Sequence, residues 1–151
     1  MSSFTSDLVV SPLSDGRRWR LCRSFTYHVG SRHSRDIIRV PKAFETDFAS
    51  TDILQWLAIL SIILWSGLMW ILPTWVAYIF LLIILLALLI TPYGRQGKPS
   101  VLHDYLYQTH SVSRHMADLI FYEAMEVTKT NPTLARLMYY GVRIGGWMAW
   151  Y

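Results

Sequence analysis

The polar residues most able to do chemistry are concentrated in the stretch LHDYLYQTHSVSRHMAD, residues 102–118. It places three histidines, two aspartates and one arginine within 17 residues. His103 and Asp104 are adjacent, and neighbouring helical residues point about 100° apart, so the two cannot easily bind one ion together. Arg114 and Asp118 are four residues apart and can pair along one helix face. The stretch predicts two helices that each present charged side chains.

A histidine with two or three carboxylates can hold a divalent ion that activates water. We expect Asp47, His103 and Asp118, from three separate elements, to be the ligands of one such ion. Asp104 would orient the imidazole or accept a proton. Arg114 would hold an anionic substrate group or neutralise Asp118. Three further residues are lesser candidates: His110, His115 and Glu123.

The same residues also fit a purely structural polar network. Arg114 and Asp118 would then form an ion pair within one helix, and Asp47 would brace a turn. His103 would bond to the backbone, and Asp104 would help to start its helix. The sequence contains no zinc-type Cys/His spacing, phosphate-binding loop or nucleophile elbow that would decide between the two interpretations.

The elements that must position these residues differ between the two ends of the chain. The first 50 residues indicate a small antiparallel β-meander, with turns at SPLSDG and GSRHSRD. In WRLCRSFTYHV, five alternating residues can share one buried face without a bulge: Trp19, Leu21, Phe25, Tyr27 and Val29.

The last third of the chain predicts three helices. The first covers Ser100–Thr109, and the second runs from an N-cap at Ser113 to about Lys129. The third begins after Asn131, with Pro132 as its first residue. The predicted fold class is therefore α+β, a meander plus three C-terminal helices.

A long apolar run separates the two parts. Residues 53–90 contain no Asp, Glu, Lys or Arg. One helix of 38 residues would span about 57 Å, which is too long for a hydrocarbon core of about 30 Å. Because Pro73 and Thr74 divide the run, we expect a transmembrane hairpin at about 53–71 and 75–90 rather than a single tilted span. Residues 1–52 and 91–151 would then form one discontinuous soluble domain.

Composition narrows the classes of function and the cellular locations that fit this chain. The chain has 151 residues and a net charge of +4, which gives no support for nucleic-acid binding. Its single cysteine excludes an internal disulfide, and its first 16 residues do not resemble a signal peptide. Basic residues on both sides of the apolar run place the soluble part in the cytoplasm by the positive-inside rule.

Several motifs occur together: IIRVPKAFETDFAS, VLHDYLY, SRHMADLIFYEAM and LMYYGVRIGGWMAW. In this order they resemble a small phage-encoded family of unknown function. The resemblance implies a viral origin and an α+β domain, but no established activity. The family elements TDF, HD, SR and AD carry over as Asp47, His103, Asp104, Arg114 and Asp118. The apolar run replaces a short proline-containing link of the family.

Two functions fit these observations. The first is a membrane-anchored phage hydrolase with a divalent metal ion at the Asp/His site. The alternative is a non-enzymatic virion-membrane or lysis component whose soluble domain is an assembly module. Either would lie in the host inner membrane or in a virion membrane. The expected partners are the lipid bilayer, further copies of the chain, and other phage membrane or structural proteins.

Overall fold

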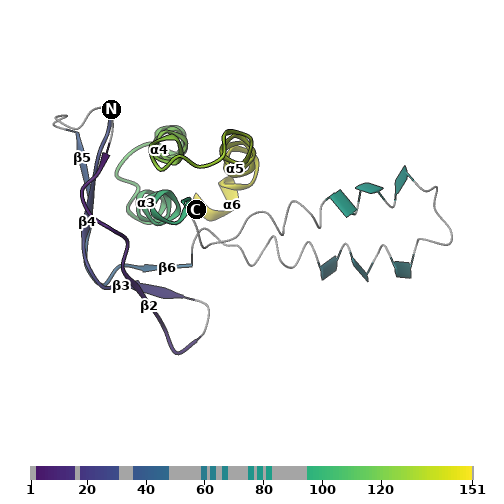
Figure 1. The fold of residues 1–151 in the computed structure, drawn as a ribbon, viewed down its shortest axis with the longest axis horizontal. Coiled ribbons are helices and arrows are strands. Elements are labelled where there is room, and N and C mark those ends of the chain that lie inside the picture. Colours follow the sequence, from purple (N-terminus) through teal and green to yellow (C-terminus); the bar gives the residue numbers. More distant parts are fainter. Residues whose placement is uncertain are drawn as a thin grey trace. The chain divides into compact units, whose positions relative to one another are not determined.

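The computed structural model describes residues 3–15, 18–30, 36–47 and 95–150, together with helical pairs at 59–60, 62–63, 66–67, 75–76, 78–79 and 81–82. The chain divides into two compact units. One unit combines Met1–Ala49 with Tyr93–Tyr151, and the other is Ser50–Pro92. All candidate site residues lie in the first unit, which is described below and drawn in Figure 1.

Three segments of chain build the β region, and each is broken in the middle. Two antiparallel sheets result, with strand orders β1-β4-β5 and β2-β3-β6. The six strands are β1 Ser3–Phe4, β2 Val10–Pro12, β3 Trp19–Leu21, β4 Phe25–His28, β5 Ile37–Val40 and β6 Glu45–Thr46. Each segment supplies one strand to each sheet, so the predicted meander is present but turns a corner halfway along.

The corner lies where the chain passes from one sheet to the other. In the middle segment, residues 22–24 separate β3 from β4, and in the last segment residues 41–44 separate β5 from β6. Ala43 has a positive φ of 67° in this second break, and its N–H donates to the carbonyl of Leu21 at 2.8 Å. The alternation of the middle segment survives the break, because Leu21, Phe25 and Tyr27 are all buried.

Among the described residues of the first unit, four helices follow the strands, and local sequence explains where three of them start. They are α3 Gly97–Thr109, α4 Arg114–Val127, α5 Pro132–Gly145 and α6 Trp147–Trp150. The Ser113 side chain accepts from the N–H of Met116, and Asn131 accepts from the N–H groups of Thr133 and Leu134, as N-caps do. The first helix starts earlier than predicted, because Pro99 is tolerated in a first turn, where backbone N–H groups need no intrahelical partner.

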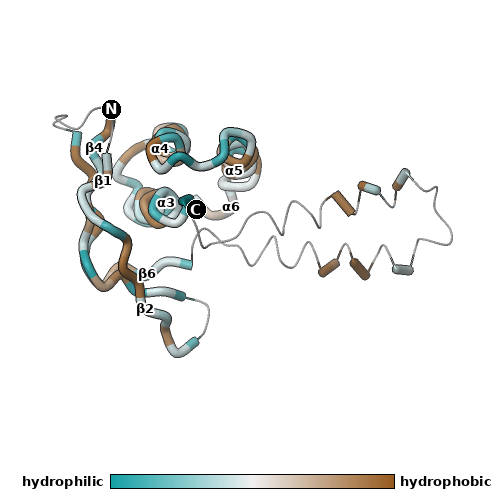
Figure 2. The backbone as a smooth tube through the Cα atoms, in the orientation of Figure 1, coloured by the Kyte–Doolittle hydropathy of each residue, from teal (hydrophilic) through white to brown (hydrophobic). Residues whose placement is uncertain are grey.

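The core lies between the strands and the first two helices. Leu21, Phe25, Tyr27 and Val40 form one cluster with residues of α3 and α4, namely Val101, Leu102, Leu106, Tyr107, Ala117, Ile120 and Ala124. A second, smaller cluster joins α4 to α5 through Phe121, Met125 and Ala135. Figure 2 shows hydrophobic and hydrophilic residues alternating around α4 and α5, as expected for helices with one buried face.

The structure corrects the predicted membrane segment. A bilayer-spanning helix needs about 20 consecutive apolar residues. Among the described residues no helix is both long enough and apolar enough to cross a membrane; α4 and α5, with 14 residues each, both carry charged side chains. This finding contradicts the hairpin inserted at 53–71 and 75–90, and with it the membrane-anchored function and the membrane localisation. Most of that stretch lies outside the described residues.

Candidate functional site

Asp118 is the centre of the candidate site. It lies in the second turn of α4, its side chain is fully buried, and three other side chains donate to it. Its Oδ1 is 3.0 Å from His103 Nε2 and accepts from the Tyr107 hydroxyl at 2.7 Å. Its Oδ2 accepts from Arg143 Nη1 at 2.9 Å. The carboxylate therefore connects α3, α4 and α5; we call these four residues the Asp118 cluster.

Helical spacing and antiparallel packing explain how the cluster forms. His103 and Tyr107 are four residues apart on α3, so their side chains lie on the same face. Their rings are in contact, with centroids 4.1 Å apart, and the imidazole also packs on Phe121 of α4 at 4.6 Å. Since α3 packs against α4, this face of α3 meets the first two turns of α4, where Asp118 lies.

The hydrogen bonds hold the cluster in one charge state. Burial alone raises the pKa of Asp118, but hydrogen bonds from His103, Tyr107 and Arg143 outweigh burial and bring the pKa below its ordinary value. Burial lowers the pKa of His103 by more than the hydrogen bond to Asp118 raises it. At neutral pH the cluster thus pairs an ionised aspartate with a neutral histidine.

Tyr107 and Arg143 support this assignment. Burial, followed by the hydrogen bond to Asp118, raises the pKa of Tyr107, so the phenol keeps its proton as a donor. The hydrogen bond to Asp118 also raises the pKa of Arg143, which stays charged. With a neutral imidazole, the Nε2 hydrogen donates to Asp118 and the Nδ1 lone pair is left as the basic end of the ring.

A glycine makes room for the cluster at the end of α5. A Cβ added at Gly146 would lie 2.5 Å from the Tyr107 hydroxyl oxygen, closer than such atoms approach in proteins. Gly141 and Gly145, four residues apart on α5, have no such close neighbour. At both of these positions an added Cβ has nothing within 4 Å. Gly146 is therefore the position that lets the chain pass beside Tyr107.

The structure brings His103 and Asp118 together, as the predicted site requires, and places the other predicted residues elsewhere. Asp104, the neighbour of His103, is buried and accepts a short hydrogen bond from Thr46 of β6. Asp47 follows β6 and is exposed, whereas Asp118 is fully buried. No three His, Cys, Asp or Glu side chains of the described residues are grouped so that they could hold a metal. The divalent ion predicted for Asp47, His103 and Asp118 stays a prediction.

Arg114 does not pair with Asp118 in the way that the four-residue spacing suggested. Its Nη2 donates instead to the backbone carbonyl of Arg143 at 2.9 Å, while the Arg143 side chain occupies the carboxylate. The two arginines thus act in sequence: Arg114 binds the backbone carbonyl of Arg143, and the Arg143 side chain neutralises Asp118. Helical spacing could not reveal Arg143, because it comes from α5, 25 residues further along the sequence.

The three lesser candidates have separate roles. Glu123 Oε1 accepts from the Tyr27 hydroxyl at 3.2 Å and from the N–H of Gly30 at 2.9 Å, which attaches α4 to the turn after β4. His110 ends α3 in the left-handed conformation, and its Nε2 is 2.7 Å from the carbonyl oxygen of Trp150. His115 is exposed at the start of α4. Among the described residues, these side chains make no contact with the Asp118 cluster that would add to its chemistry.

Sequence reasoning missed Tyr107 and Arg143 as members of the site. For Tyr107 a signal exists, because the spacing His-Asp-X-X-Tyr puts its ring on the His103 face.

Comparison with known proteins gives one match, to a family model. No significant match was found to a curated protein or to a solved structure. Residues 83–142, which include His103, Tyr107 and Asp118 and are less than half of the chain, match a family described as protein of unknown function (DUF1353).

Proposed function

We propose that this chain is an enzyme in which His103 acts as a general base that activates water for the hydrolysis of an ester or related acyl bond. The hydrogen bond of 3.0 Å between His103 Nε2 and Asp118 Oδ1 carries the proposal. A histidine oriented by a buried aspartate is the recurring base of hydrolytic sites on unrelated folds. The other two members of the cluster, Tyr107 and Arg143, donate to Asp118 and hold it in place beside the base.

The protonation states support the direction of proton transfer. A general base must be neutral before reaction, and burial lowers the pKa of His103. The aspartate must remain ionised to stabilise the imidazolium that forms, and the donors Tyr107 and Arg143 favour that state. With Nε2 bonded to Asp118, a water molecule would lose its proton to Nδ1. Asp118 would orient the ring and balance its charge without taking the proton itself.

Two other predicted residues keep proposed roles near this base. Asp104 would help to position His103, its neighbour on α3, because the Asp104 carboxylate connects α3 to β6 through Thr46. Arg114 would keep Arg143 on Asp118 through the backbone carbonyl that it binds. Both roles act through other residues, so they predict smaller losses of rate than removal of His103.

The divalent ion is a separate proposal. An ion bound between His103 Nε2 and Asp118 Oδ1 would have to replace the direct hydrogen bond of 3.0 Å between these atoms. Metal analysis of the purified chain before and after dialysis against a chelator tests it. A stoichiometric ion that is lost together with activity would support the metal site. Full activity in the dialysed protein would leave the His103–Asp118 base as the whole site.

Burial favours a second candidate, a purely structural role for the Asp118 cluster. His103 is only 3% exposed and Asp118 is fully buried. A network of this kind, with every member hydrogen-bonded, can fix the packing of three helices without taking part in catalysis. In that case the cluster would affect stability alone, and rate and stability measured on the same variants separate the two roles.

His103→Asn is the decisive variant, with His110→Asn on the same helix as its control. Hydrolysis of p-nitrophenyl acetate and p-nitrophenyl butyrate by the full chain should fall by about 10²–10⁴-fold in His103→Asn. His110→Asn should retain the rate, because His110 bonds to a backbone carbonyl at the end of α3. The wild-type rate should also fall as the pH drops through the lowered pKa of His103.

Urea denaturation of both variants completes the test. Loss of rate in a folded His103→Asn protein supports the general base. A folded variant that keeps the wild-type rate, or a wild-type chain without hydrolysis above the buffer rate, overturns the catalytic role and leaves the structural one. We also propose, from the resemblance of the motifs alone, that the gene belongs to a phage or prophage; a neighbourhood free of phage genes would contradict that origin.

A further inference from the structure

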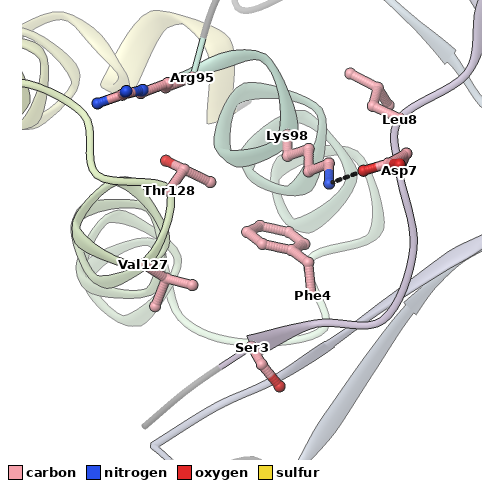
Figure 3. Close-up of a pocket in the computed structure, with 8 residues that line it drawn as sticks. All are labelled: Ser3, Phe4, Asp7, Leu8, Arg95, Lys98, Val127 and Thr128. Carbon is pink, nitrogen blue, oxygen red and sulfur yellow. Dashed lines mark hydrogen bonds and ion pairs between the residues drawn. The ribbon is translucent and has the colours of Figure 1, made fainter.

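A cavity separate from the Asp118 cluster lies between β1, the start of α3 and the end of α4. Its volume is about 690 Å³, within the range typical of small-molecule sites. Phe4, Leu8 and Val127 give it apolar walls, and Arg95, Lys98 and Asp7 supply charge. Figure 3 shows the Phe4 ring in the middle of this group, between Val127 and Lys98 in that view.

Lys98 forms an ion pair with a carboxylate that is almost fully exposed. Its Nζ is 3.0 Å from Asp7 Oδ1, but the Asp7 side chain is 97% exposed. Ion pairs with a fully exposed partner contribute little, because water and salt screen them. The same ammonium lies 5.8 Å from the centroid of Phe4, and the Lys98 side chain is only 26% exposed. The lysine is therefore held over the apolar wall, whatever anion it binds.

Arg95 adds a second positive charge at the cavity. Its Nη1 donates to the backbone carbonyl of Lys129 at 2.9 Å. That acceptor is neutral, so the hydrogen bond orients the guanidinium without compensating its charge. The beginning of α3 contributes in the same sense, since its first turn contains no acidic residue and the positive end of the helix dipole lies there. The Arg95 guanidinium points away from Lys98 (Figure 3), so Lys98 and the start of α3 make their end of the cavity electropositive, and Arg95 adds positive charge from further away.

Two of the three apolar wall residues pack against the folded core. Phe4 and Leu8 pack against the main buried cluster, and the Phe4 ring contacts those of Phe25 and Tyr27 at 5.7 and 4.7 Å between centroids. A ligand in contact with Phe4 would thus meet a fixed surface, which lowers the entropic cost of binding.

We propose that this cavity binds a small amphiphilic anion, an apolar group that carries one phosphate or carboxylate. The oxyanion would displace Asp7 from Lys98, and the apolar group would cover Phe4, while Arg95 would attract the anion only from further away, because its guanidinium points away from Lys98 (Figure 3). This site is independent of the proposed hydrolysis, because none of its residues belongs to the Asp118 cluster. Failure of one proposal leaves the other standing.

Calorimetric titration of the full chain with hexyl phosphate tests the proposal, with inorganic phosphate and hexanol as probes that each lack one half of the ligand. We expect hexyl phosphate to bind about tenfold or more tightly than either, because each of the others loses a whole class of contact. Affinity should fall as salt is raised, since both cations are near the surface. Equal affinity for inorganic phosphate and hexyl phosphate would overturn the apolar half of the site.

Variants at the ion pair give the sharpest result. Asp7→Asn should tighten binding by about twofold to fivefold, because it removes the competitor for Lys98. Lys98→Met should weaken it by about tenfold, the loss expected for a charged hydrogen bond. Lys42→Met, which removes an exposed cation from a turn outside the cavity, should bind as the wild type does. If Asp7→Asn does not tighten binding, the exchange at Lys98 is wrong, even where Lys98→Met fails to fold.

Discussion

Asp118 is the residue whose replacement should cost the most stability. Three donors converge on its carboxylate, and Asp118→Ala would leave His103 and Tyr107 without their acceptor in a buried place. Removing one partner of a buried charged pair typically costs about 3–5 kcal/mol. Because the Arg143 side chain is 31% exposed and can reach water, we expect the lower end, about 3 kcal/mol. Urea denaturation measures this loss.

Asp7→Ala is the matched control for that variant. Its carboxylate is also in an ion pair, but its side chain is 97% exposed. We expect the free energy of unfolding to change by less than about 0.5 kcal/mol. Equal effects of the two substitutions would show that the Asp118 cluster does not hold the helices together.

The pH dependence of stability follows from the same group of residues. The pKa of His103 lies below its ordinary value of 6.5, so the unfolded chain takes up this proton at a higher pH than the folded chain. The contribution of the neutral His103 to the free energy of unfolding is therefore complete above pH 6.5 and is lost as the pH falls. Asp118, with a pKa below 3.8, adds a loss of the same sign at lower pH.

We expect the free energy of unfolding, from urea titrations, to decrease between about pH 6.5 and pH 5 in the wild-type chain. In His103→Gln this part of the decrease should disappear, because glutamine does not titrate. A wild-type stability that stays constant over this interval would contradict the neutral, buried imidazole.

At the level of residues, the sequence allowed only part of the site to be predicted. His103 and Asp118 could be selected because their chemistry and helical spacing are local features. Arg143 could not, because only the packing of α4 against α5 brings its side chain to the carboxylate. For the same reason Arg114, four residues before Asp118 and the obvious local partner, was assigned the wrong contact.

At the level of elements, the contact between α3 and the junction of α5 and α6 predicts a difference between two glycines. Gly146→Ala should disturb both the last turn of α5 and the bond between Tyr107 and Asp118, since an added methyl group would clash with the Val142 carbonyl oxygen and lie 2.5 Å from the Tyr107 hydroxyl oxygen. We expect a loss of about 1–3 kcal/mol, the cost of a disturbed buried hydrogen bond. Differential scanning calorimetry of the two variants measures the effect.

Gly141→Ala is the control within the same region. Its added methyl group has nothing within 4 Å and lies inside α5, where alanine is favoured over glycine by about 0.5–1 kcal/mol. It should therefore be neutral or stabilising. If both alanines have the same effect, the close approach at Gly146 is not what constrains that position.

Helices and strands differ in how far the sequence specified them. Ser113, Asn131 and Pro132 act within one turn of their own helix, so the starts of α4 and α5 were predicted correctly. The division of the β region into two sheets was not predicted. Alternation continues through residues 22–24, and the corner appears only when all three segments break together.

At the level of the whole molecule, the unit that contains the Asp118 cluster is formed by two separated parts of the chain. Thr46, close to the end of the first part, bonds to Asp104 of α3. Gly97 precedes Asp104 by seven residues, or about 10 Å of helix. Eight extended residues span about 26 Å, so a short linker can join the two parts.

We expect a chain in which about eight Gly and Ser residues replace residues 50–92 to fold. Its amide protection in α3 and α4 should match that of the full chain by hydrogen exchange. Loss of protection in α3 would show that residues 50–92 are needed for the fold of the other unit.

The bond between Thr46 and Asp104 also has a mechanical meaning. It joins the strand just before residues 50–92 to the helix just after them, and two residue pairs join that strand, β6, to β3 in its own sheet. If the ends at residues 49 and 93 were pulled apart, tension would reach this buried contact and the short ladder before it reached the main core. In a single-molecule pulling experiment on these two ends, the contact between β6 and α3 would then bear the force first and rupture first.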